Sequence, residues 1–247
     1  MNTKYKIIIL LILVILGAFY FRAHDKKENI TSSNNEPIHL VQETETENSK
    51  EEIKKQTEFS VEVRQEIITL AGGCFWCIES AFQEEPGVID AISGYAGGDE
   101  STAKYLDVAR GKTQHREVAQ VTYNPEIIST QEIINIFWSS IDPTDPNGQF
   151  ADTGFQYTTA IFYHNELQKE IAEKSKQSLN ESDLLDSNVV TEILAFKNFF
   201  PAEEYHQDYY KKSSEHYKRY EVGSGRKGFV EETWARDAAI AFFENLK

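Results

Sequence analysis

One stretch decides the fold: Glu66-Ile67-Ile68-Thr69-Leu70-Ala71-Gly72-Gly73-Cys74-Phe75-Trp76-Cys77. Its first six residues are mostly apolar or β-branched, which predicts a strand. The glycine pair that follows predicts a tight turn. Beyond the turn, apolar residues share one face of a helix predicted from Cys74 to Gln83. A strand, a turn and a helix in direct succession place Cys74 at the helix N-terminus.

Outward from this stretch, the order of the predicted elements indicates a two-layer fold. Strands are predicted at 88–95, 117–123, 157–163 and 189–194, and helices at 130–141 and 165–179. Thr130 is the expected N-cap of the first of these helices. Two successive β-α-β units match a ferredoxin-like plait, an α/β (α+β) fold, here with extra C-terminal helices and loops. We therefore predict one globular domain at 65–247.

The segment before this domain has the pattern of a targeting sequence. Lys4 and Lys6 precede an apolar run at 7–21, which is shorter than the roughly 20 residues of a full membrane span. No small residue stands where a signal peptidase would cut, so a signal anchor at 1–24 is favoured over a cleaved signal peptide. Polar residues dominate 25–64, which predicts a disordered tether.

The orientation of this segment follows from its flanking charges. Basic residues flank the apolar run on both sides in similar number, so the positive-inside rule barely separates the two orientations. A short N-terminal tail usually stays inside. The domain is therefore expected to be membrane-anchored or secreted, and to lie outside the cytoplasm, in a periplasmic type of compartment.

The bulk composition is that of an acidic globular protein. The formal net charge is −15, with 40% hydrophobic residues. An acidic surface repels phosphate backbones, which argues against nucleic-acid binding. Cys74 and Cys77 are the two cysteines of the chain, too few for a domain stapled by disulfides. A Cys-x-x-Cys pair indicates redox chemistry or half of a metal site instead.

Cys74 is the first candidate for chemistry. A thiolate is the reactive form of cysteine, and free backbone N–H groups at a helix N-terminus favour an anion. The glycine turn leaves the sulfur open to a substrate. These features predict an activated, nucleophilic Cys74. The alternative is a small buried apolar residue, which is what most free cysteines are.

Six further residues carry little weight singly: Phe75, Trp76, Tyr95, Glu117, Asp152 and Tyr157. Glu117 fits a general acid if burial raises its pKa, and fits an exposed strand-end carboxylate equally well. Asp before Gly is ordinary turn chemistry. The adjacent aromatics fit a pocket wall or plain core packing. The two tyrosines fit an oxygen-binding role or the edge of the core.

Five segments taken together resemble one known family, the peptide methionine sulfoxide reductase A family. They are Gly73-Cys74-Phe75-Trp76, Gly94-Tyr95-Ala96-Gly97-Gly98, His115-Arg116-Glu117, Asp152-Thr153-Gly154-Phe155-Gln156-Tyr157 and the segment 199–209, which is similar to the helix that closes the domain. The resemblance covers about 66–234, nearly all of the predicted domain.

The resemblance implies a reaction and a role for each residue. Cys74 attacks the sulfur of a methionine S-sulfoxide, free or in proteins, and becomes a sulfenic acid while methionine is released. Glu117 gives a proton to the sulfoxide oxygen. Tyr95 and Tyr157 bind that oxygen, Phe75 and Trp76 hold the methyl group, and Asp152 supports the site. The implied enzyme repairs oxidised proteins and is expected to be a monomer.

The sequence departs from the common family pattern at three points. Cys77 stands where many members have Gly, no cysteine follows Cys77, and Thr158 replaces a usual Arg. Cys77 is thus the candidate to resolve the Cys74 sulfenic acid, since residues three apart share a helix face. An external dithiol, expected to be thioredoxin-like, would then reduce the pair without any cofactor or metal.

Two other classes of protein fit part of the pattern. A thioredoxin-like disulfide oxidoreductase also carries Cys-x-x-Cys after a strand, but the aromatic pair between the cysteines and the strand order argue against it. A structural zinc module would need Cys74 and Cys77 with two histidines, for which His206 and His216 are available. A zinc-type spacing is missing.

Overall fold

The computed structural model describes residues 64–246. The predicted anchor at 1–24 and tether at 25–64 lie outside the described residues, except for Arg64. Within 64–246, none of the helices has both the length and the apolar character needed to cross a membrane.

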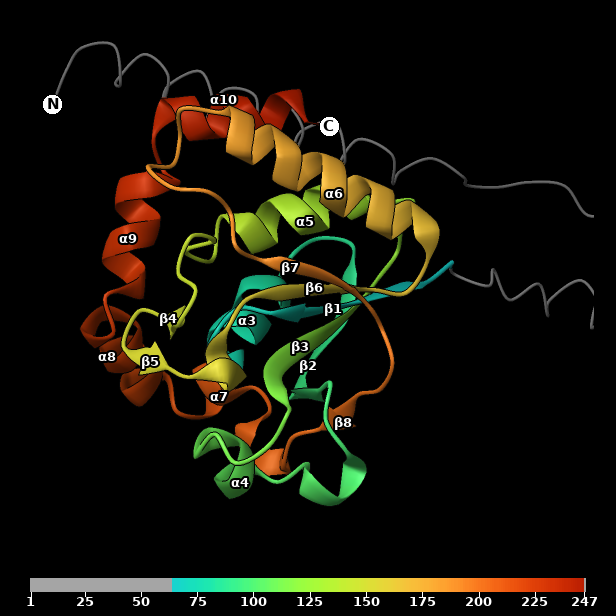
Figure 1. Cartoon of the computed structure of the whole chain (residues 1–247), viewed down its shortest axis with the longest axis vertical. Coiled ribbons are helices and arrows are strands. Elements are labelled where there is room, and N and C mark those ends of the chain that lie inside the picture. The colour runs from blue at the N-terminus through green and yellow to red at the C-terminus, as the bar shows by residue number, and fades with distance from the viewer. Residues whose placement is uncertain (1–63, 247) are drawn as a thin grey trace, which may run out of the picture. The chain divides into compact units, whose positions relative to one another are not determined.

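A six-stranded sheet forms the centre of the domain (Figure 1), in the order β7-β6-β1-β3-β2-β8. Its strands are β1 Glu66–Ala71, β2 Val88–Ala96, β3 Arg116–Tyr123, β6 Ala160–Tyr163, β7 Glu192–Ala195 and β8 Phe200–Pro201. All neighbours are antiparallel except β6 and β7. The inner order β6-β1-β3-β2 is the strand order of a ferredoxin-like plait, which confirms the predicted fold.

Three helices share a core with the sheet. They are α3 Phe75–Phe82, α5 Thr130–Trp138 and α6 Glu166–Glu181. The cluster that joins them takes Ile68 and Leu70 from β1, Ile78 and Phe82 from α3, Ile133 and Phe137 from α5, and Ala172 and Leu179 from α6, all fully buried. Each large apolar side chain buried in this way contributes about 1.5–3 kcal/mol relative to exposure.

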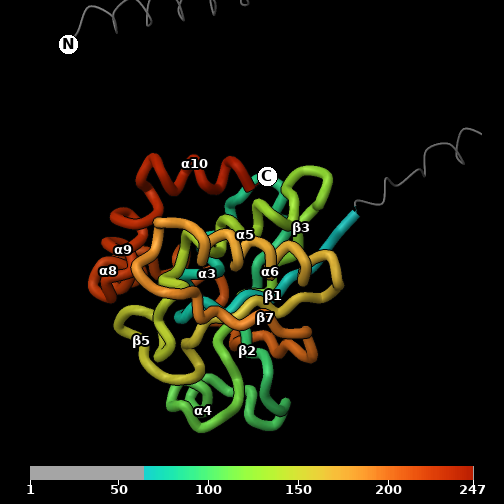
Figure 2. Tube along the Cα trace, turned by 45° about the horizontal axis from the view of Figure 1, so that its top comes forward, coloured from blue at the N-terminus to red at the C-terminus, as the bar shows by residue number. Residues whose placement is uncertain are grey.

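The C-terminal segment wraps around this core (Figure 2). It contains the 3-10 helix η3 Glu204–His206, then α7 Tyr209–Lys212, α8 Ser214–Gly223, α9 Arg226–Thr233 and α10 Asp237–Asn245. Helix α10 lies at the end of the molecule opposite α4, Tyr105–Ala109. Trp234 fixes the end of α9 to the core, since its Nε1 donates to the carbonyl of Ile141 at 2.9 Å.

Several predicted elements differ in detail. Residues 199–209 are a short strand and a 3-10 helix rather than one continuous helix, because Pro201 lacks an N–H and Asp208 has a positive φ of 52°. The strand predicted at 157–163 begins at Ala160, and Tyr157 lies in the 3-10 helix η2, Phe155–Tyr157. Short strands β4 Gly148–Gln149 and β5 Asp152–Thr153 precede it.

The N-cap of α5 also differs from the prediction. Ser129, not Thr130, is the N-cap, because its hydroxyl accepts from the amide of Glu132 and the Glu132 carboxylate accepts from the amide of Ser129. This reciprocal pair is a capping box. Thr130 instead meets Tyr123 at the end of β3, with 2.7 Å between the two hydroxyl oxygens.

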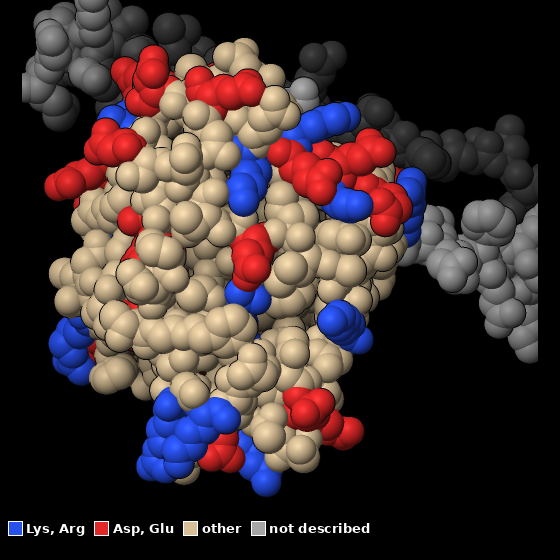
Figure 3. Space-filling view, viewed as in Figure 1, with Lys and Arg blue, Asp and Glu red and all other residues tan. Residues whose placement is uncertain are grey.

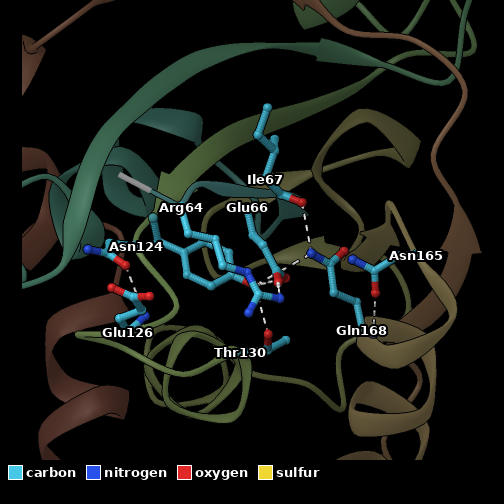
Figure 4. A network of polar contacts seen from close by, with 9 residues as sticks. Arg64, Glu66, Ile67, Asn124, Glu126, Thr130, Asn165 and Gln168 are labelled. Atoms are coloured by element: carbon cyan, nitrogen blue, oxygen red, sulfur yellow. Dashed lines mark hydrogen bonds and ion pairs between the residues drawn. The ribbon is translucent and has the colours of Figure 1, made fainter. Parts of the chain in front are cut away.

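A polar network fixes the first strand against α6 (Figure 4). Gln168 donates to the carbonyl of Ile67 at 2.9 Å, and Asn165 caps α6 by accepting from the amide of Gln168. Arg64 pairs with Glu66 at 3.2 Å. On the face drawn in Figure 3, acidic side chains gather over α6 and α10, while basic ones gather near α4.

Candidate active site

Cys74 lies at the join of the glycine turn and α3, where it is the N-cap residue. Gly73 has a positive φ of 82°, and a Cβ there would lie 2.6 Å from Gln149 and 2.9 Å from Arg226. Only glycine fits this conformation and this close packing. The turn therefore fixes Cys74 in a buried position, with 6% of its surface exposed and its thiol free.

The helix start does not act on Cys74 as the sequence predicts. The first free amide of α3, that of Phe75, donates to Glu117 Oε2 at 3.1 Å. Burial raises the pKa of the Cys74 thiol well above its ordinary value, and contacts with Cys77 and Glu117 raise it further. Burial therefore opposes the effect that the sequence predicts for the helix terminus on Cys74.

Glu117 is a buried carboxyl beside this thiol. It lies in β3 opposite Tyr95 of β2, with 2% of its surface exposed. Burial raises the pKa of Glu117 to about 8, against the opposing effect of the Phe75 amide. The alternative of an exposed strand-end carboxylate is wrong. At neutral pH this side chain holds a proton that it can donate.

The two predicted oxygen-binding tyrosines have different surroundings. Tyr157 is a neighbour of Glu117, and its hydroxyl acts against the rise in the pKa of that carboxyl. Tyr95 is fully buried, and its hydroxyl donates to Glu203 Oε2 at 2.8 Å, while Glu203 Oε1 accepts from the amide of Tyr105. A phenol has one proton to give. The hydroxyl of Tyr95 therefore donates its proton to Glu203, whereas Tyr157 lies next to Glu117.

An aromatic cluster surrounds Phe75 and Trp76. The indole Nε1 of Trp76 donates to His206 Nδ1 at 3.1 Å, and the Trp76 ring stacks on Tyr209 with 3.9 Å between centroids. The ring of His206 also lies 5.0 Å from Phe75. Phe75 and Trp76, for which the sequence left a pocket wall or core packing open, lie in this aromatic cluster next to Cys74. The sequence prediction missed His206 and Tyr209 as their partners.

Asp152 is held by a residue that the sequence did not single out. The hydroxyl of Tyr220, in α8, donates to Asp152 Oδ2. Burial raises the pKa of Asp152, while Tyr220 and the charge of Arg226 act against that rise. Asp152 thus joins the loop of β5 to the C-terminal helices at the edge of the site.

Cys77 lies one turn along α3 from Cys74, buried and free. The Cys74 thiol beside it lowers the pKa of Cys77, while burial opposes that effect. Cys74 and Cys77 share an apolar cluster with Tyr217 of α8. The geometry places the second sulfur next to the first.

The zinc alternative gains no support. His206 Nδ1 accepts from Trp76, and His216 Nδ1 contacts the Tyr209 hydroxyl at 3.2 Å. In residues 64–246, no group of three or more His, Cys, Asp or Glu side chains is arranged to hold a metal ion. The two histidines contact aromatic side chains rather than converge on the thiols.

Comparison with known proteins points to one family. A family model described as peptide methionine sulfoxide reductase matches residues 66–238. Peptide methionine sulfoxide reductase MsrA of Bacillus pumilus is 49% identical over 172 residues, covering 70% of this chain and 97% of the relative. Peptide methionine sulfoxide reductase MsrA 2 of Staphylococcus aureus (strain N315) is 48% identical over 175 residues, covering 71% and 99%.

Solved structures agree with these matches. The crystal structure of reduced Mxr1 from Saccharomyces cerevisiae has 35% identity and a TM-score of 0.58, covering 61% of this chain and 87% of that one. Methionine sulfoxide reductase A of Corynebacterium diphtheriae has 31% identity and a TM-score of 0.54, covering 61% and 76%.

A plait that buries a thiol beside a protonated carboxyl, together with these relatives, defines a thiol-dependent oxidoreductase. More narrowly, the chain belongs to the peptide methionine sulfoxide reductase family, as its five motifs indicated. It reduces methionine sulfoxide and serves the repair of oxidised proteins.

Proposed function

We propose that Cys74 is the nucleophile and Glu117 the general acid of a reductase specific for methionine S-sulfoxide. The observation that carries this proposal is the raised pKa of Glu117, about 8, next to a buried thiol. Sulfoxide oxygen is a poor leaving group until it is protonated. A carboxyl that keeps its proton at neutral pH supplies that proton where a surface carboxylate would not.

The first step joins these two groups. The Cys74 sulfur attacks the sulfoxide sulfur while Glu117 protonates the oxygen, and the thiol proton of Cys74 replaces the proton that Glu117 has given. The S–O bond of the sulfoxide then breaks, the OH group passes to the Cys74 sulfur as a sulfenic acid, and methionine leaves. Tyr157, a neighbour of Glu117, assists at the oxygen. Tyr95 assists there once its hydroxyl turns from Glu203. Phe75 and Trp76 receive the methyl group, since thioether carbons pack well on aromatic rings.

The second step uses Cys77. Its position beside Cys74 supports attack on the sulfenic acid, which gives a Cys74–Cys77 disulfide and water. An external dithiol, thioredoxin-like in chemistry, then reduces the disulfide by exchange. The enzyme accepts the sulfoxide in oxidised proteins or as the free amino acid, works as a monomer, and needs no cofactor.

The cellular setting follows from the sequence pattern at 1–24. A basic start and an apolar run support membrane anchoring, with the catalytic domain outside the cytoplasm. Cell fractionation with protease accessibility of intact spheroplasts tests this part. Full-length protein confined to the soluble cytosol would contradict it.

The catalytic proposal is tested by a single-turnover reaction on racemic methionine sulfoxide without reductant. We expect about one methionine per enzyme, loss of the S epimer alone on chiral chromatography, and a disulfide joining Cys74 to Cys77 by mass spectrometry. Cys77→Ser is the matched variant, and it should still release one methionine while losing thioredoxin-dependent cycling. Equal loss of both epimers would contradict the proposed specificity for the S epimer. If Cys77→Ser cycles with thioredoxin at the wild-type rate, Cys77 is not the resolving cysteine.

A further inference from the structure

Glu79 is a buried carboxyl on α3 that none of the proposed catalytic steps uses. Only 1% of its surface is exposed. Its Oε2 accepts a hydrogen bond from the hydroxyl of Ser93 in β2, and its Oε1 accepts one from the backbone amide of Asp208, both at 2.5 Å. In residues 64–246, no Lys, Arg or His nitrogen lies within ion-pair distance of Glu79. Glu79 therefore joins α3 to β2 and to the start of α7 as a hydrogen-bond acceptor.

The amide that Glu79 holds belongs to a residue with an unusual backbone conformation. Asp208 has a positive φ of 52°, in the left-handed region that a residue other than glycine adopts at a cost. Such a conformation persists where its surroundings hold it. Asp208 is the N-cap of α7, and this helix of four residues is far too short to be stable by itself. The direction of α7 therefore depends on the contacts that hold Asp208.

The residue before Asp208 is fixed by other contacts. Gln207 Oε1 accepts from the amide of Ser93 at 3.0 Å, and its Nε2 donates to the carbonyls of Ser93 and Ala202, both at 2.9 Å. These three bonds place the chain against β2 without Glu79. The bond from the Asp208 amide to Glu79 thus has a narrower effect, since it sets the turn through which the chain enters α7.

Tyr209 follows this turn directly, and its ring forms part of the aromatic cluster at the active site. It stacks on the indole of Trp76, with 3.9 Å between centroids and 9° between the ring planes. Trp76 and Glu79 are three residues apart on α3, so they lie on one face of that helix. Helix α3 therefore carries both the Trp76 ring and the acceptor that holds the partner of that ring.

We propose that Glu79 is a positioning residue for substrate binding: by holding the Asp208 amide it keeps the Tyr209 ring stacked on Trp76, and so fixes the aromatic wall against which the sulfoxide methyl group packs. This inference rests on the proposed role of Trp76 in receiving that methyl group. Glu79 takes no part in the attack of sulfur or in the transfer of a proton. Its loss should therefore weaken binding of the sulfoxide and leave the chemical step intact.

The test compares two substitutions of Glu79 in the full chain, by single-turnover kinetics over a range of methionine sulfoxide concentrations. Glu79→Leu removes both acceptors. Glu79→Gln keeps the contact with Asp208, because the amide oxygen can accept while the amide NH₂ donates to the Ser93 hydroxyl. In Glu79→Leu the half-saturating concentration should rise about three- to tenfold, the range that corresponds to one lost aromatic pair. The maximal rate should be unchanged, and Glu79→Gln should match the wild type in both quantities.

A spectroscopic reading follows the Trp76 ring itself. Trp138 and Trp234 are buried, whereas Trp76 is half-buried, so acrylamide quenching of tryptophan fluorescence reports mainly on Trp76. Quenching should increase in Glu79→Leu, because the Tyr209 ring no longer covers the indole. It should not change in Glu79→Gln. A contribution of Glu79 to stability alone would not move this signal in the folded protein.

Glu84→Leu is the matched control. Glu84 is also a carboxylate that joins the region of α3 to α7, but it is exposed, and it pairs with Lys211 at 3.5 Å. An exposed ion pair of this kind contributes little. The same substitution at this position should therefore change neither the half-saturating concentration nor the quenching.

A double substitution shows whether Glu79 acts through Tyr209. Tyr209→Leu removes the stacked ring and should raise the half-saturating concentration by about as much as Glu79→Leu does. Residues that act through one contact have effects that do not add. Glu79→Leu should therefore cause no further rise in a protein that already carries Tyr209→Leu, whereas additive effects would overturn the inference.

Two other results also overturn it. One is a half-saturating concentration in Glu79→Leu equal to that of the wild type. The other needs no variant to fold: the Asp208 amide of the wild type should be protected from hydrogen exchange, and exchange at the rate of an unprotected amide would exclude its bond to Glu79. Failure of the proposed function is distinct, because stoichiometric methionine release by Cys74→Ser would overturn the proposed nucleophile and leave the effects of Glu79→Leu as measured.

Discussion

The active site is built from two walls that the chain makes in different ways. The plait wall consists of Cys74, Phe75, Tyr95 and Glu117, which lie on β1, α3, β2 and β3 or the turns between them. The C-terminal wall consists of His206, Tyr209 and Tyr220, which lie on η3, α7 and α8. The walls meet at Trp76, whose ring touches residues of both.

The two walls differ in what holds them. Strand pairing and the main core fix the plait wall, so its side chains have little freedom. The C-terminal wall is fixed by ring stacking and by individual hydrogen bonds. Among these is the buried carboxyl of Glu79, which accepts from the amide of Asp208 at 2.5 Å and from the hydroxyl of Ser93. From this difference we propose that the first wall carries the chemistry and that the second adjusts the position of the substrate.

Cys74→Ser tests the plait wall most severely. A serine hydroxyl is not a nucleophile towards the sulfoxide here, so reduction should fall to background. Release of methionine in a single turnover is the measurement, with circular dichroism as the control for folding. Any residual stoichiometric release would show that another group carries the attack.

Glu117→Gln should have the next largest effect. The amide keeps the shape of the side chain but has no acidic proton, so the single-turnover rate should drop about 10²–10⁴-fold. The wild-type rate should also decline above pH 8, where Glu117 loses its proton, and the variant should lack that decline. A variant within about threefold of wild type, far below this range, would exclude general acid catalysis by Glu117.

The same carboxyl makes the stability of the fold depend on pH. Its folded pKa of about 8 exceeds the ordinary 4.5, so between these values the folded state holds a proton that the unfolded state has lost. The stabilisation is full below pH 4.5 and is lost as pH rises towards 8, at up to about 1.4 kcal/mol per unit. Urea unfolding at several pH values, with Glu117→Gln as the control, measures it. Parallel curves for the two proteins would contradict the assigned pKa.

The smallest expected effect concerns the C-terminal wall. His206→Phe keeps a ring against Phe75 but removes the acceptor for the Trp76 indole, a bond worth about 0.5–1.5 kcal/mol. We expect KM for the sulfoxide to rise up to about tenfold while the rate of the chemical step changes little. Tyr205→Phe, an exposed neighbour, is the matched control. If the chemical step suffers as much as in Glu117→Gln, the division of labour between the two walls does not hold.

The plait wall is also the part of the molecule that the sequence predicts well. The apolar and β-branched run at 66–71, the alternation of apolar residues in 117–123 and the glycine pair before Cys74 carry local signals of strand and turn. The strand order of the plait follows from them. The local signals did not predict that the Phe75 amide donates a hydrogen bond to Glu117, a residue 42 positions away in the sequence. The burial that raises the pKa of the Cys74 thiol was also invisible in the local pattern.

The C-terminal wall could not be read from sequence to the same extent. The contact between Tyr220 and Asp152 spans 68 residues, and that between Arg226 and Gly72 spans 154. Neither contact produces a periodic pattern in the sequence. The helical spacing of residues after 209 does not show which face of each helix lies against the active site. His206 was visible only as a possible zinc ligand. The motif at 199–209 marked the segment but not the tasks of its side chains.

The hydrogen bond from the Phe75 amide to Glu117 has one more consequence for catalysis. With the proton on Glu117, the bond is an ordinary neutral contact. Once that proton has moved to the sulfoxide oxygen, the acceptor is a carboxylate, and a bond to an ionised acceptor is roughly twice as strong. The amide is already aimed at the charge that the reaction creates, so no reorganisation is needed at that moment. In the proposed mechanism, the Phe75 amide thus stabilises the carboxylate that remains on Glu117 after it has given up its proton.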